Sequence, residues 1–131
     1  GIFCALVSHG SSTVPQYIVK EINDLGGTIT NAYGIPKDQL KEVSKLGIAK
    51  INVDTDIRLA MTGAVRKFLA ENPEKFDARE WLKPAREAAK QVCKARYLEF
   101  GCEGQGAKIK GYTLEQMAKR YAAGELAQIV N

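Results

Sequence analysis

Two short stretches of the chain end in side chains that are suited to catalysis or ligand binding. The first is an apolar run that ends at His9, the only histidine, and continues at once into Gly10, Ser11 and Ser12. An imidazole can bind a metal or move a proton, while backbone N–H groups and hydroxyls can hold a phosphate or an oxyanion. A capped, solvated strand end is the other interpretation of this stretch.

The second stretch, residues 48–56, is another apolar run that ends in polar side chains. Asn52 and Asp54 lie on one face of an extended strand, because side chains alternate along it. Thr55 and Asp56 follow where a helix is expected to begin, and helix N-termini attract phosphate. Asp54, Thr55 or Asp56 could simply cap that helix. Capping does not account for Asn52.

Both runs are predicted to be buried strands, each followed by a helix, because they are apolar without a helical period and are bounded by polar or glycine residues. Such βα units favour a parallel α/β fold, which places ligands at the carboxyl ends of its strands. Helices are predicted after Thr13–Pro15, from Pro36 to Gly47, from Asp56 to Asn72, from Pro84 to Gly101 and after Thr113. Inward-facing apolar positions are expected at Ile18, Ile22, Ile57, Met61 and Phe68. Residues 113–116 fit a capping box at the start of the last helix, and its apolar side is expected at Leu114, Met117, Ala118 and Tyr121.

The composition is that of a globular protein, with 45% hydrophobic and 26% charged residues. A net charge of +4 suits anionic substrates such as sugar phosphates and is too small to indicate nucleic-acid binding. Three cysteines, an odd number, favour reduced thiols and a cytoplasmic location. No apolar run reaches the roughly 18 residues of a membrane span.

At the two polar stretches the sequence becomes similar to a known family. Residues 9–15 and 50–56 closely resemble the two signature loops of class II fructose-bisphosphate aldolases, which are zinc-dependent (β/α)8 barrels. The resemblance continues through residues 58–63, 76–79, 82–85 and 117–121. It implies the C-terminal part of such a barrel, because 131 residues are fewer than the roughly 250 of a complete one. On this basis residues 1–72 form the last two βα units, and residues 73–131 form a C-terminal helical arm and tail.

The resemblance implies a zinc site with three histidine ligands, of which His9 matches the last. The other two, and a carboxylate that relays protons, belong to earlier strands of the family's barrel. Asn52 matches the catalytic residue that hydrogen-bonds the enediolate. A monovalent cation near the phosphate is a further implied cofactor.

The same resemblance implies a phosphate cradle. Gly10 and Ser12 match phosphate-holding positions with Ser11 between them, and Thr55 approaches the phosphate from the other strand. Val53 and Asp54 complete the substrate contacts, Asp54 by orienting the triose. For Ser11 and Asp56 a turn or capping role is the preferred interpretation.

Arg79 matches an arginine that reaches across a dimer interface and binds the second phosphate of the substrate. A surface arginine paired with Asp77 or Glu80 is the other interpretation. The match implies a homodimer or a dimer of dimers.

The expected function is therefore reversible cleavage of fructose 1,6-bisphosphate to dihydroxyacetone phosphate and glyceraldehyde 3-phosphate by the complete protein. Two alternatives remain open. One is a tagatose-bisphosphate aldolase, which uses the same zinc and phosphate groups, and the other is a non-catalytic, phosphate-binding barrel segment.

Overall fold

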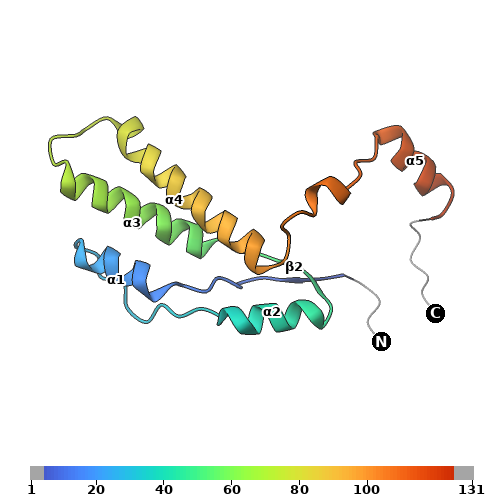
Figure 1. Cartoon of the computed structure of the whole chain (residues 1–131), viewed down its shortest axis with the longest axis horizontal. Helices are drawn as coiled ribbons and strands as arrows, with labels where there is room; N and C mark the ends of the chain where they lie inside the picture. The colour runs from blue at the N-terminus through green and yellow to red at the C-terminus, as the bar shows by residue number, and fades with distance from the viewer. Residues whose placement is uncertain (1–4, 126–131) are drawn as a thin grey trace. The chain divides into compact units, whose positions relative to one another are not determined.

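The computed structural model describes residues 5–125, apart from the side chain of Ser44. Two strands, five α-helices and one 3-10 helix follow one another in these residues (Figure 1): β1 (Leu6–Ser8), α1 (Gln16–Asp24), α2 (Lys37–Lys45), β2 (Ile48–Ile51), α3 (Thr55–Glu71), α4 (Ala78–Glu99), η1 (Gly106–Lys108) and α5 (Leu114–Ala122). The chain divides into two compact units, residues 1–101 and 102–131.

The sheet of the first unit is the pair β1–β2, which runs parallel with Val7 opposite Lys50 and Ser8 opposite Ile51. This confirms the prediction of two adjacent parallel strands, each followed by a helix. The expected burial was wrong, since Leu6 and Val7 are 36% and 46% exposed. Apolar strands are buried when neighbouring strands and helices cover both faces. The described residues supply only these two strands, so much of each strand stays exposed.

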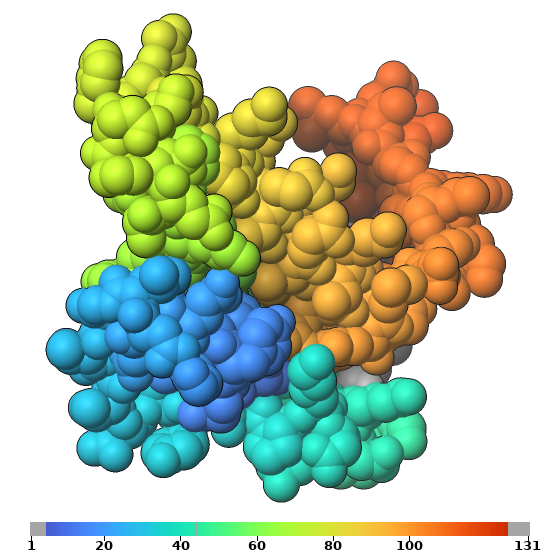
Figure 2. Space-filling model, turned by 60° about the vertical axis from the view of Figure 1, so that its left-hand side comes forward, coloured from blue at the N-terminus to red at the C-terminus, as the bar shows by residue number. Residues whose placement is uncertain are grey.

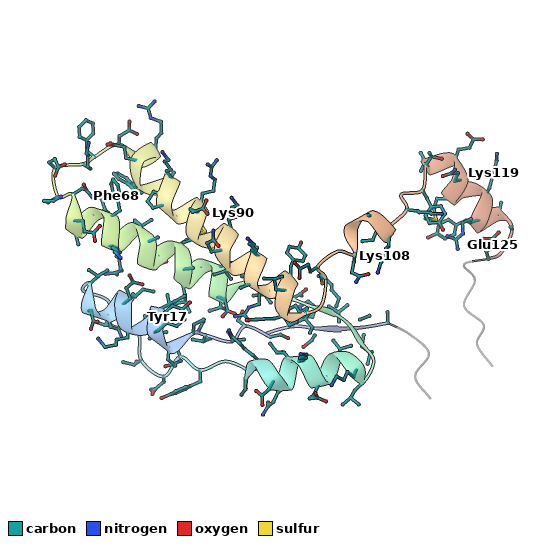
Figure 3. The ribbon with its side chains drawn as sticks, in the orientation of Figure 1. Tyr17, Phe68, Lys90, Lys108, Lys119 and Glu125 are labelled. Atoms are coloured by element: carbon teal, nitrogen blue, oxygen red, sulfur yellow. The ribbon has the colours of Figure 1, made fainter. Side chains whose placement is uncertain are left out.

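Helices α1, α3 and α4 form the core of the first unit, with α3 and α4 side by side along most of their length (Figure 1). Figure 3 draws the side chains of these helices and labels Tyr17 of α1, Phe68 of α3 and Lys90 of α4. Ile18 and Ile22 of α1 pack against Ala60 of α3, as the apolar spacing of α1 predicts. The two helices lie close at Gly63, where a Cβ would make ordinary van der Waals contact with Ile18 and Ile22 at 3.6–3.7 Å. Figure 2 shows α1 and α3 packed together at the surface.

The inward face of α3 differs from the prediction. Asp56, Ala60 and Gly63 are its buried residues, whereas Ile57 and Met61 are only half-buried. Because α1 and α4 both pack on the side that carries Ala60 and Gly63, the apolar residues one position later turn toward the flank.

Helix α4 begins six residues before the predicted start at Pro84, which lies inside the helix. Asp77 explains the early start, since its side chain accepts a hydrogen bond from the N–H of Arg79 and caps the first turn. The helix then continues through a proline, at the cost of one backbone hydrogen bond. The boundary expected between residues 72 and 73 falls inside the first unit, because α4 packs along α3.

The second unit contains η1 and α5. Thr113 and Gln116 form the predicted capping box at the start of α5, each side chain receiving the other's backbone N–H. The apolar side expected on this helix is largely exposed, with Leu114 at 88% and Tyr121 at 68%. Within residues 5–125, no helix combines the length and the apolar character that crossing a membrane requires.

Candidate functional site

His9 and Asn52 meet at the carboxyl edge of the two-stranded sheet. His9 directly follows β1 and Asn52 directly follows β2, and Asn52 Nδ2 lies 2.9 Å from His9 Nδ1. Lys50 Nζ donates to Asn52 Oδ1 at 2.5 Å, which points the amide NH2 toward the imidazole. The amide therefore donates to Nδ1, and His9 carries its lone pair on that nitrogen.

Ser12 joins the two polar stretches. Its hydroxyl oxygen accepts hydrogen bonds from the N–H groups of Asp54 at 3.3 Å and Thr55 at 3.0 Å. These N–H groups open α3, so Ser12 caps that helix from 42 residues away, while Asp54 at the N-cap position makes no side-chain cap. Asp54 instead pairs with Arg58 at 2.7 Å, and the side chains of Asp54 and Thr55 are exposed. A phosphate-attracting helix start thus lies beside the loop that follows His9.

Gly10 and Ser11 shape the turn between His9 and Ser12. Gly10 has a φ of +65°, which glycine adopts without strain, and nothing lies within 4 Å of where its Cβ would be. Ser11 is fully buried, and its Oγ lies 2.5 Å from Ser8 Oγ. This geometry fits the preferred turn role for Ser11, whose hydroxyl has an internal partner.

Asp56 holds the same loop from the other side. Its buried carboxylate accepts hydrogen bonds from Val14 N at 2.7 Å, Thr13 N at 3.0 Å and Thr13 Oγ1 at 3.0 Å. The sequence placed Asp56 at a helix start and favoured a cap. The structure shows that it tethers a loop 42–43 residues earlier in the chain.

Arg96 of α4 is a buried partner that sequence reasoning missed. Its Nη2 donates to Asp56 Oδ2 at 3.2 Å and to Thr13 Oγ1 at 2.8 Å, and Nη1 donates to Glu99. Removing one partner from a buried ion pair costs about 3–5 kcal/mol, because the other charge stays buried. One signal was present in the sequence, since Arg96 continues the apolar side of α4 four residues after Val92.

The segment before α2 supports the loop by close backbone contact. Ile35 N donates to Ser12 O at 3.0 Å, and a Cβ on Gly34 would lie 2.3 Å from that oxygen. Only glycine fits there without movement. On the same loop Val14 has a φ of +50°, an unfavourable conformation for a β-branched residue. Such strain persists only where the surroundings impose it.

The structure does not bring Arg79 to this edge. Arg79 lies in the first turn of α4, which begins near the C-terminal end of α3, and the 17 residues of α3 extend about 25 Å from the sheet (Figure 1). Its guanidinium is 89% exposed and pairs with Asp77 at 2.5 Å. This pairing and the Arg79 N–H lower the pKa of Asp77 below 3.8, and Asp77 in turn raises the pKa of Arg79.

The residues present fit part of a metal site. His9 offers an exposed imidazole at the sheet edge, which suits one zinc ligand. Among residues 5–125, no group of three or more histidine, cysteine or acidic side chains is placed to hold a metal ion. A catalytic zinc needs about three protein ligands. The described part of the chain therefore contributes at most a share of such a site.

The similarity to known proteins covers both polar loops and helices α1 to α4. The family described as fructose-bisphosphate aldolase class-II matches residues 2–105. Fructose-bisphosphate aldolases of Xanthobacter flavus and Pseudomonas aeruginosa are each 50% identical over 126 residues, which is 96% of this chain and 36% of the relative. The fructose-bisphosphate aldolase of a Nostoc species is 48% identical over 124 residues, 95% of this chain and 34% of the relative. The chain spans about a third of the length of these relatives.

Proposed function

The chain belongs to the class II fructose-bisphosphate aldolase family, and from this premise we propose that a complete barrel containing it cleaves fructose 1,6-bisphosphate reversibly. The products are dihydroxyacetone phosphate and glyceraldehyde 3-phosphate. The observation that carries the proposal is the meeting of His9 and Asn52 at one sheet edge, beside the start of α3. We further propose that the two strands are the last two of a (β/α)8 barrel, with residues 73–131 as a C-terminal extension.

His9 is the zinc ligand that this segment supplies, together with two histidines from earlier strands. Zinc is a Lewis acid that polarises a substrate carbonyl and needs no redox change to do so. Asn52 is the catalytic residue, and its amide NH2 donates to the oxygen on which negative charge develops in the enediolate. Its contact with His9 supports this role, because it places the amide donor next to the metal-binding imidazole.

The phosphate of dihydroxyacetone phosphate is held between the two loops. Gly10, Ser11 and Ser12 supply the first loop, and Val53, Asp54 and Thr55 supply the second. The Ser12 hydroxyl oxygen accepts the N–H groups of Asp54 and Thr55, which leaves its own hydrogen as a donor beside the start of α3 and supports its role in holding phosphate. A monovalent cation beside the phosphate offsets part of its charge.

Arg79 binds the second phosphate of a substrate that is held in a neighbouring subunit. The protein is therefore a homodimer or a dimer of dimers. Its location is the cytoplasm. A guanidinium grips phosphate oxygens through paired, charge-assisted bonds. The 89% exposure of its side chain supports a role outside its own subunit.

The test is a cleavage assay on the complete protein with fructose 1,6-bisphosphate and tagatose 1,6-bisphosphate. Activity with fructose 1,6-bisphosphate that a chelator abolishes and zinc restores supports the proposal. A clear preference for tagatose 1,6-bisphosphate would change the proposed substrate and leave the proposed type of reaction unchanged. Chelator-resistant activity, or none in a zinc-loaded complete protein, contradicts it.

A further inference from the structure

We propose that Arg96, acting through Asp56, is a positioning residue for the loop of residues 11–14, so that helix α4 sets the affinity for phosphate. The inference rests on the proposed function, which gives this loop its phosphate. Arg96 donates hydrogen bonds to Thr13, Asp56 and Glu99, none of which is a proposed substrate contact, so it acts on the loop through Thr13 and Asp56.

The contacts form one continuous chain from α4 to the loop. Arg96 Nη2 donates to Thr13 Oγ1 and to Asp56 Oδ2, and Thr13 Oγ1 donates to the same carboxylate oxygen at 3.0 Å. The other carboxylate oxygen accepts Val14 N at 2.7 Å. Every oxygen of Asp56 is thus used to hold either the loop or the arginine that neutralises it.

The burial of this pair argues against a surface ion pair of little consequence. The side chain of Asp56 is 0% exposed and that of Arg96 is 10% exposed. Arg96 Nε is also buried without a hydrogen-bond partner in the described structure. A buried charge and an unpaired donor both disfavour folding, so apolar residues would stabilise this position more simply. A charge here is explained if it orients a carboxylate toward the loop.

The conformation of the loop shows what the carboxylate holds in place. Val14 keeps a φ of +50°, and its N–H makes the shortest of the Asp56 contacts. Ser12, two residues earlier, places its hydroxyl on the first N–H groups of α3. Because Asp56 lies in the first turn of α3, it fixes the loop and the helix start relative to each other. These are the two sides of the proposed phosphate cradle.

The test compares Arg96→Met, Arg96→Lys and the double variant Asp56→Asn/Arg96→Met in the complete protein. Arg86→Met is the matched control, since Arg86 is exposed on the same helix. The readouts are KM and kcat for fructose 1,6-bisphosphate, and the dissociation constant of inorganic phosphate by calorimetry. We expect Arg96→Met to raise KM and the phosphate dissociation constant roughly tenfold or more, with a smaller change in kcat. Arg96→Lys should restore part of the affinity, and Arg86→Met should leave all three values unchanged.

The double variant separates positioning from stability. It removes the unpaired buried charge, so its thermal midpoint should recover toward that of the parent. Its phosphate affinity should stay low, because an asparagine cannot accept all three loop hydrogen bonds. Recovery of affinity together with stability would overturn the inference, as would parental phosphate affinity in Arg96→Met.

If Arg96→Met does not fold, Arg96→Lys and the double variant carry the same comparison. If the parent binds phosphate but cleaves no bisphosphate, the proposed function fails while the phosphate readout still tests Arg96.

Discussion

His9 Nδ1 and Asn52 Nδ2 lie 2.9 Å apart although 43 positions separate the two residues in the chain. The parallel pairing of β1 and β2 produces this contact, because both residues follow strands that end at the same edge. Lys50 orients the amide by donating to its oxygen. The imidazole and the amide donor are therefore held against each other at the sheet edge.

Asn52→Ala in the complete protein should lower kcat by about 100-fold or more, the usual cost of losing one donor to a developing negative charge. KM should change much less, because the charge on that oxygen develops during the reaction. Steady-state kinetics with fructose 1,6-bisphosphate measures both values. A comparable rise in KM with an unchanged kcat would place Asn52 in substrate binding instead.

Ser12→Ala is the contrasting variant for this comparison. It should mainly raise KM, and the lost helix cap should lower the free energy of unfolding by about 1 kcal/mol. If both substitutions left the kinetics unchanged, the assignment of these loops to the substrate would be wrong.

Gly34→Ala should disturb the loop without removing any polar side chain. The new Cβ would lie 2.3 Å from Ser12 O and 2.4 Å from Thr13 C, so the backbone must move. We expect a loss of about 1–3 kcal/mol in the free energy of unfolding, together with weaker phosphate binding. Denaturant unfolding and calorimetry with inorganic phosphate measure the two effects. Gly111→Ala is the control, because its Cβ meets nothing within 4 Å, and an equal effect in both variants would refute the close contact.

The cap of α4 should respond to acid. The Arg79 side chain first, and its N–H second, lower the pKa of Asp77 below 3.8. Ionised Asp77 therefore stabilises the folded state above its ordinary pKa, and this contribution is lost as the pH falls through the folded value. Carboxyl NMR should give a midpoint below 3.8 for Asp77, and Arg79→Ala should raise it. A midpoint at or above 3.8 in the parent would contradict the observed pairing.

Arg79→Ala should separate the two phosphates of the substrate. Cleavage of the bisphosphate should weaken, whereas proton exchange on dihydroxyacetone phosphate alone should be almost unchanged, since that reaction lacks the second phosphate. Both rates can be measured on one preparation of the complete protein. Equal losses in the two assays would mean that Arg79 supports the fold, for example through its contact with Asp77.

The features that the sequence predicted correctly are those that follow from local pattern and strand topology. Two apolar runs with polar ends indicated parallel βα units, and this placed His9 and Asn52 at one edge. The capping box at Thr113 was equally local. In each case the deciding interactions lie within a few residues or follow from the direction of the strands.

The features that were missed depend on helix packing. Arg96 lies 40 positions from Asp56, and only the docking of α4 on α3 brings them together. The start of α4 was set by Asp77 rather than by Pro84, because a good cap outweighs one lost backbone bond. The buried face of α3 was misplaced by one residue for the same reason, since its two helical neighbours determine which side is covered.

Zinc content measured on the complete protein and on its His9→Ala variant tests whether His9 is a ligand of a catalytic zinc. We expect one firmly bound zinc per chain and zinc-dependent cleavage of fructose 1,6-bisphosphate in the parent, with both lost in the variant. The 131-residue chain alone should bind zinc weakly, because its described residues lack a set of three ligands. Full zinc content and activity in the His9→Ala variant would show that His9 does not bind the catalytic zinc.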